Sequence, residues 1–144
     1  MMKRILVMLS LLLIVVLGLI ACSTGTGEAM LEDTAWVLES YGEPGNLKAV
    51  IVDIQITAEF VSAEETVKGS AGCNSYFGSY ELKGSQLSIP GFIAATEMYC
   101  MEPEGVMDQE QEYLAVLQLA ESYEIDGDEL HIDCGSQVLI FKSD

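Results

Sequence analysis

The chain has 144 residues, a length that suits one domain and is short for two. It carries 23 aspartates and glutamates against six lysines and arginines, for a formal net charge of −17. A field of this sign repels nucleic-acid phosphates and anionic head groups, which disfavours binding to DNA, to RNA or through a polybasic membrane contact. The charge suits the solubility of an exported domain or, alternatively, attraction of a cationic partner.

The first 21 residues are typical of a secretory signal peptide. Lys3 and Arg4 form a basic start, and an almost wholly apolar run from Ile5 to Ile20 follows. An uncleaved membrane anchor is the alternative. However, the 17 residues from Ile5 to Ala21 would span only about 25 Å as a helix, less than the ~30 Å hydrocarbon core.

The end of this segment, Leu19-Ile20-Ala21-Cys22, resembles a lipobox, in which the cysteine is acylated and becomes the new N-terminus. We therefore predict that residues 1–21 form a lipoprotein signal peptide and that Cys22 is the lipidation site. Residues 22–30 are polar and glycine-rich and are predicted to form a flexible tether. The protein is then expected in the cell envelope, anchored by lipid on the extracytoplasmic side of a membrane.

Three further cysteines follow, at positions 73, 100 and 134. An oxidising compartment permits disulfides, and three thiols allow at most one internal bridge. The residues alone leave the pairing open.

The first half of the domain is predicted to be strands and turns. Residues 31–41 are expected to form a strand with Trp36 anchored in the core, and residues 42–46 a loop containing Pro44 and Gly45. Apolar residues alternate with polar ones from 50 to 60, which predicts the longest strand, and residues 62–65 are expected to turn the chain.

The segment 70–80 breaks this strand-like sequence sharply. Gly72 and Asn74 suit backbone with positive φ, and Gly78 suits a bulge or a close backbone approach. Tyr76 and Tyr80 are expected on a packed, pleated surface. A hairpin is predicted over residues 80–89, around a short glycine turn.

A short apolar segment at 92–96 leads to Met98 and Cys100. A helix is predicted over residues 103–122. One stripe of this helix carries Val106, Glu110, Tyr113, Leu117 and Ala120. Glu112 is expected on a solvated face. Glu110 falls beside the core stripe near the helix start, so we predict a structural contact for it. Its replacement by glutamine is expected to cost about 0.3–1 kcal/mol through the helix dipole. Residues 123–141 are predicted to form a three-stranded meander.

No catalytic, metal or cofactor site is predicted. The single histidine, His131, lies three residues before Cys134, and residues three apart on a strand point to opposite faces, which disfavours a Cys–His pair. The acidic residues 126–133 lack the order of a calcium loop, and Asp-Gly-Asp is ordinary hairpin chemistry.

Several motifs resemble the META domain family, to which the heat-shock lipoprotein HslJ belongs. They are Gly72-Cys73-Asn74-x-Tyr76-x-Gly78-x-Tyr80, Thr96-x-Met98-x-Cys100, Met107-x-x-Glu110, Leu31-x-x-Thr34-x-Trp36 and the closing segment from Leu130 to Phe141. The resemblance covers almost all of residues 31–144 and implies a mainly β fold with one helix, in a small, curved, antiparallel, barrel-like sheet. It also implies a disulfide between Cys73 and Cys100, which belong to the shared motifs, whereas Cys134 does not.

The resemblance implies an envelope or secreted protein that serves in stress or drug tolerance without established catalysis. We therefore expect a non-catalytic binding or interaction module whose partner is an unidentified envelope protein or small ligand. A lipocalin-like carrier of a small apolar ligand is the alternative, since Met98, Met101 and Met107 lie near the predicted helix start. An enzyme is the third reading.

Overall fold

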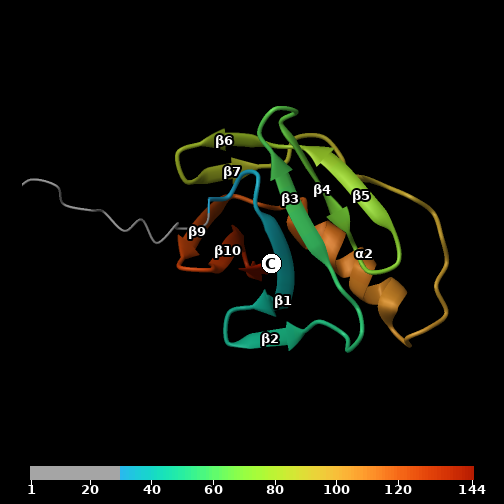
Figure 1. The fold of residues 1–144 in the computed structure, drawn as a ribbon. Coiled ribbons are helices and arrows are strands. Elements are labelled where there is room, and N and C mark those ends of the chain that lie inside the picture. The colour runs from blue at the N-terminus through green and yellow to red at the C-terminus, as the bar shows by residue number, and fades with distance from the viewer. Residues whose placement is uncertain (1–29) are drawn as a thin grey trace, which may run out of the picture.

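In residues 30–144, eleven strands pair into one sheet that curls into a half-barrel, and one helix packs along its concave side (Figure 1). The computed structural model describes residues 30–144. The predicted signal peptide and the lipidation site Cys22 lie outside the described residues. The elements are β1 (Ala35–Glu43), β2 (Asn46–Ala49), β3 (Thr57–Val61), β4 (Thr66–Ser70), β5 (Ser75–Ser79), β6 (Glu81–Lys83), β7 (Gln86–Ser88), β8 (Ala94–Ala95), α2 (Val106–Leu117), β9 (Ser122–Asp126), β10 (Glu129–Cys134) and β11 (Gln137–Ser143).

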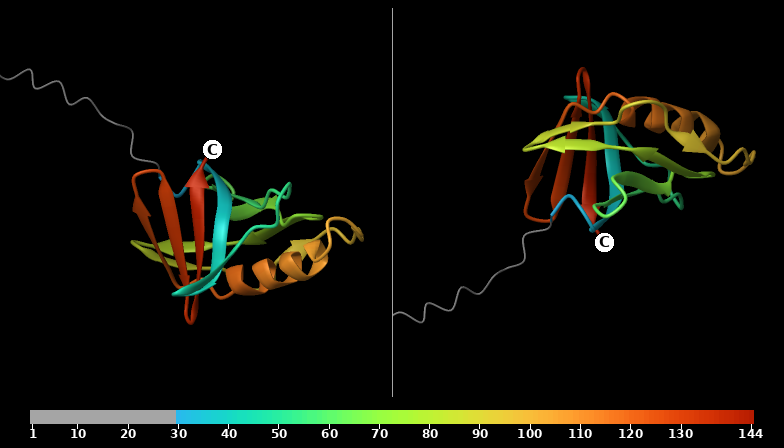
Figure 2. Two further views of the ribbon diagram at one scale, coloured as in Figure 1. Left: turned by 90° about the horizontal axis from the view of Figure 1, so that it is seen from below. Right: turned by 90° about the horizontal axis from the view of Figure 1, so that it is seen from above.

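The strand order is β6-β7-β9-β10-β11-β1-β3-β4-β5-β8, with β2 paired to β1 off this path. All of these strand pairs are antiparallel. One side of β1 pairs with β11, and its other side is shared: the first half pairs with β3 and the second half with β2. The sheet therefore bends at β1, and Figure 2 shows the two halves crossing at a steep angle.

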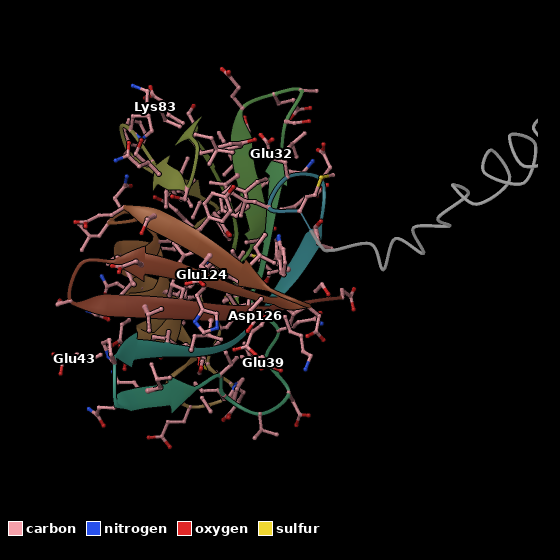
Figure 3. All side chains as sticks on the ribbon, turned by 90° about the vertical axis from the view of Figure 1, so that its left-hand side faces the viewer. Glu32, Glu39, Glu43, Lys83, Glu124 and Asp126 are labelled. Carbon is pink, nitrogen blue, oxygen red and sulfur yellow. A yellow bond between two sulfur atoms is a disulfide. The ribbon has the colours of Figure 1, made fainter. Side chains whose placement is uncertain are left out.

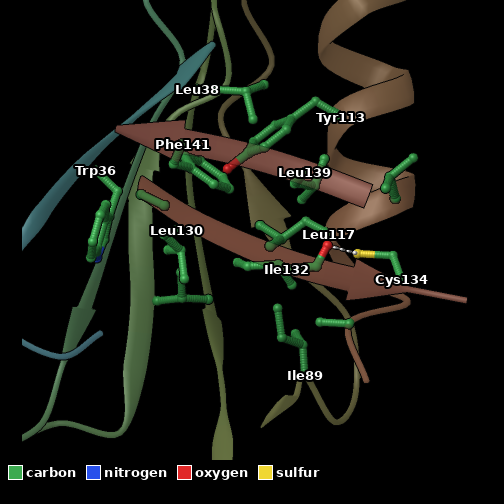
Figure 4. Packing of buried hydrophobic residues seen from close by; sticks show 14 of the residues in the cluster. Trp36, Leu38, Ile89, Tyr113, Leu117, Leu130, Ile132, Cys134, Leu139 and Phe141 are labelled. Atoms are coloured by element: carbon green, nitrogen blue, oxygen red, sulfur yellow. Dashed lines mark hydrogen bonds between the residues drawn. The ribbon is translucent and has the colours of Figure 1, made fainter. Parts of the chain in front are cut away.

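The core fills the space between the helix and the curled sheet (Figure 4). Trp36, Phe60, Tyr113 and Phe141 are all fully buried, and the Tyr113 and Phe141 rings meet edge to face at 6.4 Å. Each such side chain contributes roughly 1.5–3 kcal/mol by leaving water. The Trp36 indole also donates to the Leu31 carbonyl over 3.0 Å, which fastens the start of the domain to the core.

This architecture confirms the predicted fold class, a mainly β chain with one helix in a curved antiparallel sheet. The hairpin at 80–89 and the C-terminal meander are also present where the alternation of apolar residues placed them. In both, short glycine turns join strands that pair with their neighbours in sequence, so local pattern suffices to predict them.

The predicted strand over residues 50–60 is wrong before Thr57. Asp53 has a φ of 66°, and the Ile54 amide donates to the Ile51 carbonyl, so the chain turns here. Val52 is 80% exposed as a result. Ile56 still points into the core, and its carbonyl accepts from the Leu38 amide of β1, so the apolar alternation already begins before β3.

The N-terminal boundary and the first loop also differ from prediction. The first strand begins at Ala35, after Asp33 with a φ of 60°, and it continues to Glu43. The region predicted as a loop instead begins a tight hairpin that leads into β2. The side chains of β2 are all exposed, so burial does not distinguish this strand from a loop.

The helix is shorter than predicted at both ends. It begins at Val106, after Gly105 in a left-handed conformation with a φ of 86°, and it ends at Leu117. A left-handed residue cannot continue an α-helix, so residues 103–105 form a turn instead. Within the described part of the chain, this helix lacks the length and apolar character needed to cross a membrane.

Candidate interaction surface

The loop at residues 71–74 closes on itself before β5 begins. The Ala71 amide donates to the Asn74 carbonyl over 2.8 Å. Gly72 has a φ of 121°, and a Cβ there would lie 3.3 Å from Ile54 Cγ2 and 3.5 Å from Val106 Cγ2. Only glycine meets both requirements without strain, because the backbone is left-handed and the start of the helix presses against it.

Glu110 reaches this loop from the second turn of α2. Its Oε2 accepts from the backbone amides of Cys73 (3.0 Å) and Asn74 (2.6 Å), and its Oε1 accepts from Asn74 Nδ2 (2.7 Å). The side chain is 6% exposed. Hydrogen bonds to a carboxylate are stronger than those between neutral groups, so Glu110 holds the loop to the helix.

Asn74 also forms hydrogen bonds with the segment that follows β8. Its Oδ1 accepts from Thr96 Oγ1 (2.8 Å) and from the Met98 amide (2.7 Å), while its Nδ2 also donates to the Met98 carbonyl (3.0 Å). The Asn74 amide group thus bonds through both its oxygen and its nitrogen. The backbone of residues 96–98 is fixed in place relative to the helix.

The disulfide between Cys73 and Cys100 fastens the same segment a second time. The bridge joins Cα atoms 6.0 Å apart, and the Cys100 amide lies 3.4 Å from Met107 Sδ. The pairing implied by the family resemblance is therefore confirmed. Cys134 is free and buried, and its burial raises the pKa of the thiol to about 12.

The fixed segment turns its large apolar side chains outward. Met98 is 59% exposed and Tyr99 and Met101 are each 79% exposed, although their backbone is held by the disulfide and Asn74. Exposed Val52 lies on the adjacent loop, since the Ile51 amide donates to Gln109 Oε1 over 2.8 Å near the start of α2. We call Val52, Met98, Tyr99 and Met101 the apolar tip. The outward methionines do not line the interior of the half-barrel, as a carrier would require of them.

Carboxylates lie close to the apolar tip along the chain. Asp53, Glu97, Glu102, Glu104 and Asp108 are all exposed, and we call them the acidic rim. The sequence contains no lysine or arginine between Lys83 and Lys142. The tip therefore combines exposed apolar surface with a strongly negative field.

The remaining motif residues lie away from this cluster. Tyr76 is buried in the core, where its hydroxyl donates to the Thr57 carbonyl (2.9 Å) and lies 2.7 Å from the Tyr113 hydroxyl. Burial raises the pKa of both phenols. Gly78 is required by close packing, since a Cβ there would lie 3.3 Å from Ile93 Cγ1.

Tyr80 secures the N-terminal part of the domain. Its ring meets Phe60 edge to face at 5.2 Å, and its hydroxyl donates to Glu32. Burial and this bond to a carboxylate raise the pKa of the Tyr80 phenol. Tyr80 thus has a structural partner, remote in sequence, that the motif alone does not reveal.

Groups suited to chemistry stay apart. His131 Nε2 lies 2.8 Å from Glu129 Oε1 on the outside of the sheet, whereas Cys134 points into the core and contacts the Ile132 carbonyl (Figure 4). In residues 30–144, no three histidine, cysteine, aspartate or glutamate side chains converge as a metal site would need.

A second surface feature lies on the outer face of β3, β4 and β5. A hollow of about 770 Å³ is lined there by residues that include Thr57, Lys68 and Phe77. The Phe77 ring is 60% exposed. Thr57, Lys68 and Phe77 alternate along the strands with buried Ala58, Val67 and Tyr76, so their side chains point away from the core. The hollow therefore lies on the outer side of the sheet, and Ala58 and Tyr76 also border it.

Two glutamines hold loops to the helix, and neither was predicted. Gln109 is 3% exposed and accepts from the Ile51 amide. Gln118 accepts from the Ile93 amide (3.0 Å) and donates to the Ile89 carbonyl (2.7 Å). Gln109 lies next to the apolar stripe at helical spacing, and this position in the sequence could have indicated that its side chain is buried.

Comparison with known proteins gives one family and several structural neighbours. The family model of the META domain matches residues 29–144. An NMR structure of a protein from Burkholderia xenovorans is similar, with a TM-score of 0.66, 28% identity and coverage of 79% of this chain and 83% of that one. A crystal structure of a DUF4847 family protein from Bacteroides vulgatus has a TM-score of 0.55 at 15% identity, covering 78% and 94%. A search of curated proteins found no match.

Proposed function

We propose that this chain, which belongs to the META domain family, is a non-catalytic interaction module that binds its partner through the apolar tip. Membership confirms the resemblance carried by the motifs around Gly72, Thr96 and Glu110. We further propose that lipid on Cys22 anchors it on the extracytoplasmic side of a membrane, where it serves in stress or drug tolerance.

One observation carries the proposal. The segment 96–101 is held by three hydrogen bonds to Asn74 and by the disulfide, yet it presents Met98, Tyr99 and Met101 to solvent. Exposed apolar side chains on a rigid backbone favour binding, because little backbone conformational entropy is lost when a partner arrives. A segment needed only for folding would turn these side chains inward.

The position of the tip fits an anchored protein. The described chain starts at residue 30 on the side of β9 and β10, and the loop before α2 lies at the far end of the molecule (Figures 1 and 2). An anchor upstream of residue 30 would attach at one end and leave the apolar tip free at the other.

Photo-crosslinking in intact cells tests the proposed function. A photoreactive phenylalanine analogue replaces Tyr99 in the full-length chain, and a matched variant carries it at Leu119, which is 59% exposed beyond the other end of α2. We expect a discrete cross-linked product from position 99 and none from 119. Loss of that product with Met98→Ser and Met101→Ser would support the tip, whereas equal products from both positions, or none, would refute it.

Tolerance is tested by complementation of a deletion strain under heat or drug challenge. The wild-type chain and a Leu119→Ser variant should restore growth, and the Met98→Ser, Tyr99→Ser, Met101→Ser variant should not. If the tip variant, present at the wild-type protein level, also restored growth, the apolar tip would not be needed for tolerance.

The anchor is tested by mass spectrometry of protein extracted from its own membrane. We expect an acylated Cys22 as the first residue. A free Cys22 thiol, or a Cys22→Ala chain that is processed and located like wild type, would refute lipidation.

A carrier of a small apolar ligand is the second candidate function. The hollow on the outer face of β3, β4 and β5 is the proposed ligand site. The interior between sheet and helix is filled by Trp36, Phe60, Tyr113 and Phe141. A hollow of about 770 Å³ falls within the ~300–1,000 Å³ of small-molecule sites. A fluorescent apolar probe should therefore bind wild type and not Phe77→Ser; equal binding by both would refute this site.

A further inference from the structure

We propose that the apolar tip and the acidic rim together bind a basic amphipathic segment of a partner protein. This inference rests on the proposed function, since it names the chemistry of the partner that the tip receives.

The apolar tip comes from two loops that both lie against the start of the helix. A Cβ at Gly105 would lie 3.6 Å from Ile51 Cδ1, and the Ile51 amide bonds to Gln109. The loop with Val52 therefore abuts the turn that precedes α2, and Cys100 joins the segment with Met98 and Tyr99 to the same place. Figure 1 shows the β2–β3 loop and the loop before α2 at the same end of the molecule.

The acidic rim carries charge that the described residues do not neutralise. The salt bridges of residues 30–144 join Lys48 to Glu112, Lys68 to Glu59, Lys142 to Asp128 and His131 to Glu129. None of them includes a residue of the acidic rim. These carboxylates are exposed and free to attract cations, which raises the encounter rate with a basic partner.

The apolar side chains suit a segment with an apolar face. Methionine is flexible and polarizable, so Met98 and Met101 can pack against apolar side chains of varied shape. Tyr99 offers a ring face that attracts the charged group of lysine or arginine. A helix with one apolar and one basic face matches both parts of this surface.

The other occupants fit less well. A second copy would bring two acidic rims together, and like charges across an interface are repulsive. A membrane surface with anionic head groups would be repelled for the same reason. A basic segment gains from the same field that disfavours both.

The test uses the full-length protein in phosphatidylcholine nanodiscs, with empty nanodiscs as the blank. The probe is a fluorescent peptide of about 18 residues, roughly five helical turns, with leucine on one face and lysine on the other. A matched probe carries glutamate in place of lysine. Fluorescence anisotropy gives the Kd at about 20 mM and at about 150 mM salt, where screening differs strongly.

We expect the leucine–lysine probe to bind about tenfold more weakly at the higher salt, and the leucine–glutamate probe not to bind. Met98→Ser with Tyr99→Ser and Met101→Ser should weaken binding by at least about tenfold at both salts, because apolar contact is not screened. Glu97→Gln with Glu102→Gln and Glu104→Gln should weaken it about tenfold at low salt and little at high salt.

A control with the same change in charge decides whether the site is specific. Glu43→Gln, Glu124→Gln and Asp126→Asn alter exposed carboxylates on the face opposite the tip (Figure 3), and binding should stay within about twofold of wild type. Equal weakening by this control, binding of the glutamate probe, or no binding by wild type would overturn the proposal.

The cellular experiment separates the two failures. If position 99 still cross-links to a partner while the peptide fails to bind, the basic segment is wrong and the proposed function stands. If position 99 cross-links to nothing, the proposed function fails. A cross-link to a second copy of the chain would overturn the inference.

Discussion

Replacing Glu110 with glutamine is expected to lower the free energy of unfolding by about 2–4 kcal/mol. Glutamine keeps the shape of glutamate but offers only one acceptor oxygen. If that oxygen accepts from the Cys73 and Asn74 amides, the new amide nitrogen faces Asn74 Nδ2, and two donors meet. Asn74 cannot flip to relieve this, because its Oδ1 accepts from Thr96 and Met98.

The opposite orientation is no better. The glutamine oxygen then accepts from Asn74 Nδ2, and the amides of Cys73 and Asn74 lose their acceptor. A buried donor without a partner costs about 1–3 kcal/mol, and the bonds that remain lose the strengthening effect of the charge. The expected loss therefore exceeds the 0.3–1 kcal/mol anticipated from the helix dipole alone.

Urea unfolding followed by Trp36 fluorescence measures the effect, since Trp36 is the only tryptophan and is fully buried. With a slope of about 1–3 kcal/mol per molar urea, the midpoint should fall by roughly 0.7–4 M. Glu112→Gln is the matched control on the same helix. Glu112 forms an exposed pair with Lys48, so its loss should cost about 0–1 kcal/mol. Equal midpoints for the two variants would refute the role assigned to Glu110.

Three further predictions concern the disulfide, a glycine and the buried thiol. Reduction of Cys73–Cys100, whose cysteines are 27 residues apart, should cost about 3–4 kcal/mol of stability in the chain-entropy model, and an unchanged urea midpoint in reductant would contradict this. Gly72→Ala should destabilise by about 1–3 kcal/mol, since its φ of 121° strains any side chain, and a melting temperature equal to wild type would count against it. Burial raises the pKa of Cys134 to about 12, so its contribution to stability is full below pH 9, the usual thiol value, and is lost as pH rises from 9 to 12. Cys134→Ala should therefore flatten the alkaline fall of the urea midpoint, and identical pH profiles for both chains would reject this.

The elements that could be predicted from the sequence are those formed by neighbours along the chain. The hairpin at 80–89, the C-terminal meander and the apolar stripe of α2 each depend on local alternation or helical spacing. The segment 50–56 misled prediction because inward Ile56 continues the alternation of β3, while Asp53 turns the chain. Local pattern does not distinguish an inward-facing loop from a strand.

The candidate site needed contacts between distant residues. Glu110 meets Asn74, 36 positions earlier, only because the helix packs beside the 71–74 loop. The family motifs identified the two residues but not their partnership. The apolar tip was missed for a different reason. Hydrophobic residues are expected inside, and no local feature shows that Met98, Tyr99 and Met101 face solvent while their backbone is fixed.

The short strands at the two ends of the strand order affect the tendency of the protein to aggregate at high concentration. The strand order ends in β6, with three residues, and in β8, with two. The free edge of β6 also carries exposed Glu81 and Lys83. A long, flat, apolar edge allows strands of other molecules to pair with it and form aggregates, whereas such short end strands offer few backbone groups for pairing. The fold therefore exposes apolar side chains at its tip, while the two ends of its strand order offer little edge on which a fibril could grow.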